Sequence, residues 1–122
     1  MAHPVKRSNA PVFWLLFGAG GMLAALLGPM LVLITGIAAP LGWVLPPDAL
    51  SYDNMLAFSR NIPGKLFIFA VVTLFVWHAA HRIYHTLHDL GIRRNRLSMG
   101  FCYGISLAAT LLAGYALVII GF

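Results

Sequence analysis

The chain has 122 residues, of which 61% are hydrophobic, and it contains only eight Lys and Arg and three Asp and Glu residues. A water-soluble domain of this size needs a far more polar surface, so the composition excludes a soluble globular protein and favours a membrane protein. The single cysteine, Cys102, excludes an internal disulfide. No Cys or His ligand pattern surrounds it, so we expect no metal site and interpret Cys102 as a small helix-packing residue.

Three apolar stretches reach the length of about 20 residues that a helix needs to cross about 30 Å of hydrocarbon. They cover residues 12–39, 64–88 and 99–122 and use up most of the chain. We therefore predict an all-α membrane protein with three transmembrane helices, folded as a single domain over residues 1–122.

The basic residues indicate the orientation of the chain. Lys6 and Arg7 precede the first span, and Arg93, Arg94 and Arg96 lie between the second and third, whereas the charges between the first two spans cancel. The positive-inside rule then predicts a cytoplasmic amino terminus and a periplasmic carboxyl terminus. These cations can bind anionic membrane lipid. We expect no nucleic-acid partner, because the arginines are not interleaved with aromatic residues.

The first and third spans carry small residues at helical spacing. In lipid, a stripe of small side chains lets another helix approach closely. The stripes are Gly18, Gly21, Ala25 and Gly28 in the first span, and Gly100 and Gly104 in the third. Pro29 is expected to kink the first helix.

A short helix is predicted between the first two spans. Asp48 or Ser51 can cap it, it runs to about Arg60, and its apolar side chains are able to lie on the membrane interface. Pro63 then starts the second span.

The second span passes without a breaker into ionisable side chains. Its histidines are spaced 3, 4 and 3 and therefore lie along one side of the helix. They are His78, His81, His85 and His88, and Arg82 lies beside them. Ionisable groups at membrane depth are costly, so this turn is a candidate functional site.

The depth of this turn in the membrane indicates which residues of the first span lie beside it. The apolar run 66–77 covers only about 18 Å, so His81 and Arg82 lie near the inner edge of the hydrocarbon. The first helix begins at the same inner surface, which places Trp14 and Phe17 at a similar depth. Hydrogen-bond donors beside a group that accepts protons near neutral pH suit a quinone, whose reduced form loses two protons and two electrons.

Other interpretations of these residues stay open. Trp14 can belong to the aromatic belt of the membrane interface, and Arg82 can extend to lipid headgroups. His85 and His88 can form a solvated face.

Several segments together resemble the D subunit of fumarate reductase. The resemblance covers roughly the first ninety residues and includes polar matches that hydrophobic composition alone would not produce. It is carried by residues 6–8, 11–14, 16–22, 48–52, 56–58 and 81–82, and by His85 and residues 88–90.

The resemblance implies a three-helix membrane anchor that pairs with a similar C subunit. Together they attach a flavoprotein and an iron-sulfur protein to the bacterial inner membrane, where the complex oxidises menaquinol and reduces fumarate in anaerobic respiration. It implies a quinone site, shared with the partners, that uses Trp14 and Arg82, with Phe17, Gly18 and His81 nearby. FAD and the iron-sulfur clusters then belong to the partners, this chain is not catalytic alone, and no haem is expected.

Two rival functions remain to be distinguished. The first is a haem b subunit of a succinate dehydrogenase-like complex, in which His78 or His81 would be an axial ligand. The second is a structural or assembly protein whose His/Arg turn docks a soluble partner. A transporter is a more distant alternative, because three helices offer no inverted repeat.

Overall fold

The computed structural model describes residues 9–122, and these form four α-helices and no strand. Helix α1 spans Ala10–Leu33 and continues as a π-helix, η1, over Ile34–Ala38. A short helix, α2, spans Tyr52–Arg60. The long helices α3 and α4 span Ile62–Asp89 and Arg96–Ile120.

Three helical segments are long and apolar enough to cross a membrane, namely Ala10–Ala38, Ile62–Asp89 and Arg96–Ile120. Each end lies within three residues of the predicted span. The predicted fold class, an all-α membrane protein with three spans, is confirmed.

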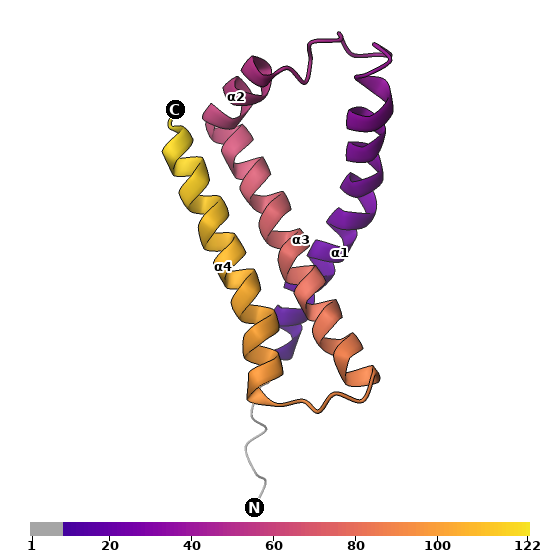
Figure 1. Ribbon diagram of the computed structural model, residues 1–122, viewed down its shortest axis with the longest axis vertical. Coiled ribbons are helices and arrows are strands. Elements are labelled where there is room, and N and C mark those ends of the chain that lie inside the picture. Colours follow the sequence, from indigo (N-terminus) through magenta and orange to yellow (C-terminus); the bar gives the residue numbers. More distant parts are fainter. Residues whose placement is uncertain (1–8) are drawn as a thin grey trace, which may run out of the picture.

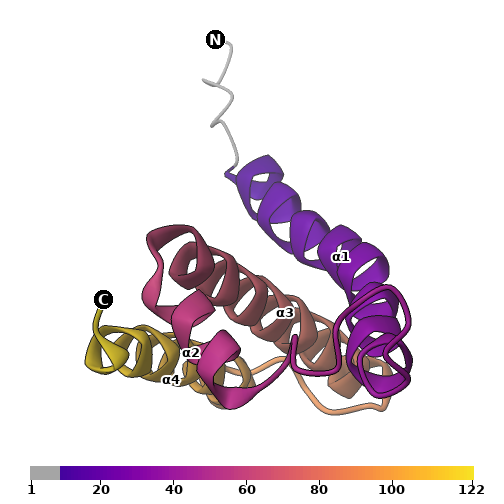
Figure 2. The same cartoon turned by 90° about the horizontal axis from the view of Figure 1, so that it is seen from above.

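Helix α3 lies between α1 and α4 and contacts both (Figure 1). Helices α3 and α4 run side by side, whereas α1 crosses α3 at one end and diverges from it at the other, as the view from above also shows (Figure 2). We name the crossing end, which holds the loop 90–95, the loop end, and the opposite end the α2 end. The start of α1 lies at the loop end, and the carboxyl terminus lies at the α2 end (Figure 1).

The predicted cytoplasmic side corresponds to the loop end. Arg93, Arg94 and Arg96 are exposed there. Lys6 and Arg7, the other cations of that prediction, lie outside the described residues. The orientation in the membrane therefore stays a prediction, as does the place of α2 on the membrane surface.

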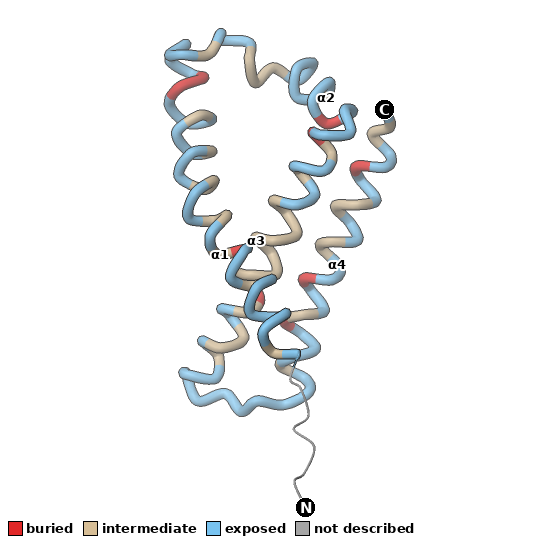
Figure 3. The backbone as a smooth tube through the Cα atoms, turned by 180° about the vertical axis from the view of Figure 1, so that it is seen from behind, coloured by how far each residue is buried: buried red, intermediate tan, exposed pale blue. Residues whose placement is uncertain are grey.

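The contacts between helices are made by small residues. Only a few residues of each described helix are buried (Figure 3), and many large apolar side chains are exposed. In lipid this is the expected arrangement, because close backbone approach rather than exclusion of water holds helices together. The buried residues of the long helices are Gly20, Gly64, Ala80, Cys102, Ser106 and Leu117. The predicted packing role of Cys102 is confirmed.

Gly20 is the point where α1 comes closest to α3. A Cβ atom there would lie 2.5 Å from the Leu74 carbonyl oxygen and 2.9 Å from the His78 Cβ. At Gly21 an added Cβ would lie 2.8 Å from the His78 ring, whereas at Gly18 and Gly28 nothing lies within 4 Å. Within this chain the contact therefore uses Gly21 of the predicted stripe and Gly20, which lies outside it. The packing of Gly18 and Gly28 against another helix stays a prediction.

Proline does not end the first span. Pro29 lies inside α1, and the helix continues for four residues to Leu33. The backbone departs from α-helical geometry only after Leu33, in the π-helical turn η1. There the Thr35 hydroxyl donates to the Leu31 carbonyl oxygen at 2.7 Å.

The α2 corner is fixed by a cap and by a close contact. The Ser51 hydroxyl oxygen accepts a hydrogen bond from the backbone N–H of Asn54, so one of the two predicted caps is confirmed. Pro63 lies in the first turn of α3, as predicted. Gly64 is buried against the Phe58 carbonyl, where any Cβ would overlap the oxygen.

Two cationic side chains donate hydrogen bonds to carbonyl groups in the last turn of α4. The Lys65 ammonium donates to the Leu117 carbonyl at 2.6 Å, and Arg60 Nε donates to the Ile120 carbonyl at 3.4 Å. The last carbonyls of a helix lack intrahelical partners and attract positive charge. The Lys65 bond joins the end of α4 to the start of α3, and the Arg60 bond joins it to the end of α2.

Candidate functional site

The crossing of α1 and α3 stacks an aromatic ring on a histidine. The Phe17 and His81 rings lie 4.0 Å apart between centroids and are inclined by only 10°. His78, one turn away on α3, bonds through Nδ1 to the Phe17 carbonyl oxygen at 2.9 Å. The close approach at Gly20 makes both contacts possible, so the helix crossing itself positions the imidazoles.

Helix α4 adds a hydroxyl to this pair. The Tyr103 hydroxyl lies 3.0 Å from His81 Nδ1, and its ring lies 6.1 Å from that of Trp77. Trp77 in turn donates through Nε1 to the Thr110 hydroxyl at 3.0 Å, which aligns α3 and α4. A cavity of about 320 Å³ opens here, lined by Phe13, Phe17, Trp77 and Tyr103.

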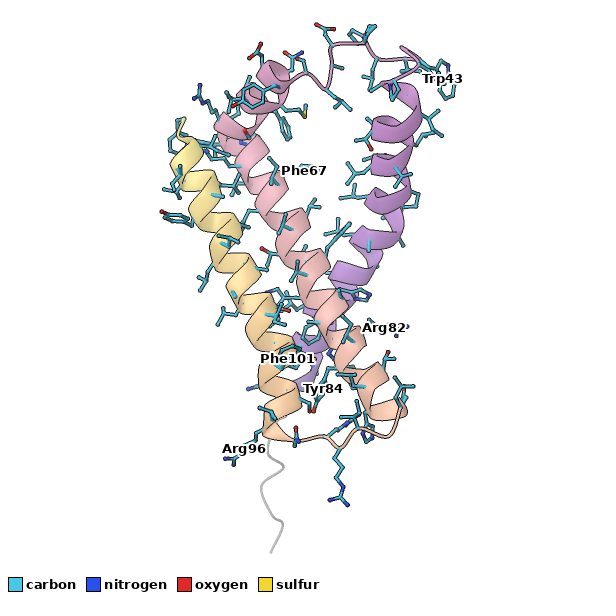
Figure 4. The ribbon with its side chains drawn as sticks, viewed as in Figure 1. Trp43, Phe67, Arg82, Tyr84, Arg96 and Phe101 are labelled. Atoms are coloured by element: carbon cyan, nitrogen blue, oxygen red, sulfur yellow. The ribbon has the colours of Figure 1, made fainter. Side chains whose placement is uncertain are left out.

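Three of the five predicted site residues do not touch this pair. Trp14 is 74% exposed, Arg82 is exposed, and Gly18 has open space where a side chain would be. Figure 4 shows Arg82 projecting to the side of α3 away from α4. Trp14 and Gly18 lie within one turn of Phe17 on α1, and Arg82 follows His81 on α3. All three are exposed, and we call them the uncovered border of the crossing.

A larger cavity lies elsewhere and has different chemistry. It measures about 600 Å³ and lies at the α2 end, between the end of α1, α2 and α3. Leu31, Met55, Phe58 and Phe67 are among its lining residues, and none of the residues that line it is a His, Lys, Arg, Asp or Glu. Without a charged donor or a group that titrates near neutral pH, it is a poorer candidate for proton-coupled chemistry than the crossing.

Sequence reasoning missed the contribution of α4. No residue of the third span was among the predicted site residues, yet the Tyr103 hydroxyl contacts His81 and its ring lines the cavity. Tyr103 lies two turns from the start of the third span, and His81 lies two turns from the end of the second. Because the two helices are antiparallel, these positions lie at the same depth in the membrane, and a comparison of depths could have predicted the contact between Tyr103 and His81.

Comparison with known proteins decides the family. The family model for the D subunit of fumarate reductase matches residues 4–118. The chain belongs to this family. The fumarate reductase D subunit of Vibrio cholerae serotype O1 (strain M66-2) is 44% identical over 115 residues, which cover 94% of this chain and 85% of that protein. The Vibrio vulnificus (strain YJ016) protein of the same name is 44% identical over 115 residues, covering 94% and 89%.

The family also extends beyond these two bacteria. The protein of the same name from Mycobacterium bovis (strain BCG / Pasteur 1173P2) is 42% identical over 119 residues, covering 96% of this chain and 93% of the relative. Family membership and the three spans together make this chain a multi-pass membrane subunit of an enzyme complex.

We predict that this subunit binds no haem. The edge of the His78 ring rests on Gly21, so α1 occupies the space that a macrocycle bound to His78 Nε2 would need. A reduced-minus-oxidised spectrum of the purified complex should show no b-type band from this subunit. A band that disappears in His78→Ala or His81→Ala would contradict this.

Proposed function

We propose that this chain anchors a fumarate reductase complex in the bacterial inner membrane and forms one wall of its menaquinol oxidation site. In this proposal, the flavoprotein carries FAD, the iron-sulfur protein carries the clusters, and a C subunit forms the rest of the membrane part. The chain binds and orients quinol and has no catalytic activity by itself.

The observation that carries the proposal is the stacked Phe17–His81 pair beside an aromatic cavity. A quinol head group is a flat aromatic ring with two oxygens, and flat rings pack on aromatic side chains. Phe13, Phe17 and Trp77 offer such surfaces, while His81 and Tyr103 offer polar atoms at the same level. The residues present therefore fit the ligand.

Each of the proposed quinol-binding residues has a distinct task. Arg82 is permanently charged and Trp14 carries an indole N–H, so both can donate hydrogen bonds to a quinol oxygen as it loses its proton. His81 is able to accept that proton, because an imidazole titrates near neutral pH. Gly18 leaves open space beside Phe17 into which the ring can enter.

The uncovered glycines support a second membrane subunit. Gly18, Gly28, Gly100 and Gly104 have no other atoms within 4 Å of an added Cβ, so this chain does not use them for its own packing. A partner helix could approach closely at each of them. The exposed arginines 93, 94 and 96 border the same end as the candidate site, where the soluble partners are proposed to dock.

The anchoring part of the proposal is tested at Gly28. Gly28→Leu should lower the amount of flavoprotein and iron-sulfur protein that copurifies with the tagged chain by several-fold, because the added side chain separates the partner helix. Gly28→Ala adds a single methyl and should retain the partners. Unchanged recovery with Gly28→Leu would contradict the proposal at this position.

The quinol part is tested by kinetics. Arg82→Leu should slow fumarate reduction driven by quinol and leave reduction driven by an artificial dye near normal, since the dye feeds the soluble partners directly.

A further inference from the structure

A line of polar side chains leads from the quinol-binding residues to the loop end. His81 begins it, bonded to Tyr103. The His85 ring lies 4.5 Å from the His81 ring, edge to face, and His85 Nδ1 lies 3.3 Å from Nη2 of Arg94. His85 therefore contacts both His81 and the exposed Arg94.

Among the described residues, His85 joins the two ends of this line. Its ring touches His81 on one side and Arg94 on the other, and the Tyr84 ring lies 5.7 Å away. Tyr84 in turn lies 5.6 Å from Tyr103, and Figure 4 shows it near the loop end of α3. Exposure increases along the line, from the half-buried His81 and His85 to the fully exposed Arg94.

We propose that His85 is a proton relay that carries protons from His81 to water at the loop end. This inference rests on the proposed function, in which quinol is oxidised beside His81. Nothing in that function requires His85, which neither stacks on Phe17 nor lines the aromatic cavity.

Quinol is the reductant, and its protons and electrons leave by different routes. Each of its two O–H bonds breaks, and the two electrons pass to the iron-sulfur protein of the complex, so that quinol becomes quinone. Each proton binds to His81 at Nε2, because Nδ1 is engaged with the Tyr103 hydroxyl. His81 returns to its neutral form by passing the proton to Nδ1 of His85, which Arg94 leaves at that moment, and His85 then releases the proton on its Nε2 to water.

Arg94 makes the release favourable. A guanidinium only donates hydrogen bonds, so its contact with His85 Nδ1 requires that nitrogen to be an acceptor, as it is in neutral His85. When His85 takes up a proton, both ring nitrogens become donors, and the two cations repel each other. The proton then leaves toward the solvent that borders the exposed Arg94.

The competing explanation is structural. The contact between His85 and Arg94 also fastens the loop 90–95 to α3, and a variant could slow turnover by loosening that loop. His85→Gln separates the two explanations, because its amide oxygen can still accept from Arg94 but the side chain cannot carry a proton.

The experiment uses the membrane-bound complex and compares quinol-driven with dye-driven fumarate reduction. His85→Ala and His85→Gln should each slow the quinol-driven rate by at least about tenfold, as expected for loss of a positioned proton acceptor. Both should raise the solvent deuterium isotope effect, and added imidazole should restore part of the rate in His85→Ala. Dye-driven rates should stay near normal. His88→Ala, the same change one turn further on at an exposed position, should leave quinol-driven turnover unchanged.

The remaining outcomes separate a failure of the relay from a failure of the proposed quinol site. If His85→Gln has the normal rate, or if imidazole and deuterium have no added effect in His85→Ala, His85 has a structural role and the relay is wrong. If the His85 variants are normal while Arg82→Leu is slow, the relay is wrong and the quinol site stands. If Arg82→Leu is normal as well, the proposed function fails with it.

Discussion

Gly20→Ala should destabilise the protein although it adds only one methyl group. The new Cβ would lie 2.5 Å from the Leu74 carbonyl oxygen, and a backbone atom cannot turn aside as a side chain can. The helices must therefore separate, and with them Phe17 from His81 and His78. Overpacking of this kind typically costs about 1 to 3 kcal/mol, and the melting temperature of the purified complex in detergent should fall.

Gly28→Ala is the matched control for this prediction, since it makes the same change in the same helix where no atom lies within 4 Å. Its stability should be unchanged or slightly higher, because Ala favours a helix by up to about 1 kcal/mol over Gly. Equal melting temperatures for the two variants would show that α1 and α3 do not cross at Gly20.

The number and bounds of the spans could be predicted because length and apolar composition alone determine them. The bilayer requires about 20 apolar residues, and the turn residues Ser51 and Pro63 mark helix starts through local chemistry. Length and composition do not predict which face of one helix packs against which face of another. Gly20 and Gly21 are adjacent, and periodicity does not say which of several small residues meets a partner.

The candidate site was predicted in part for a similar reason. Depth in the membrane follows from distance along a helix, so Phe17 and His81 were expected at one level, and the structure stacks them. Rotation of a helix about its axis does not follow from depth. For this reason Tyr103 was missed, and Trp14 and Arg82, expected close by, lie at the uncovered border of the crossing.

Arg82→Leu should have the largest effect on quinol-driven turnover of the substitutions at the uncovered border. The guanidinium is permanently charged, so in the proposed function it stabilises negative charge on a quinol oxygen that is losing its proton. A hydrogen bond to a charged group contributes about 1.5 to 3 kcal/mol, which corresponds to roughly 10- to 100-fold in rate if it acts mainly in the transition state. Trp14→Phe keeps a ring and loses only the indole donor, so its effect should be milder.

Arg93→Leu is the control for the loss of charge. Arg93 is exposed in the loop 90–95 at the same end of the molecule, outside the quinol-binding residues. This variant should keep its quinol-driven rate. The membrane content of the complex must be measured for each variant, so that a rate is expressed per assembled complex.

The ratio of quinol-driven to dye-driven fumarate reduction in the assembled Arg82→Leu complex tests the proposed site most directly. We predict that this ratio falls by about 10- to 100-fold, with the complex still in the membrane and the dye-driven rate near that of the unaltered complex. A ratio equal to that of the unaltered complex, or loss of the complex from the membrane in both Arg82→Leu and Trp14→Phe, would show that these residues do not act on quinol.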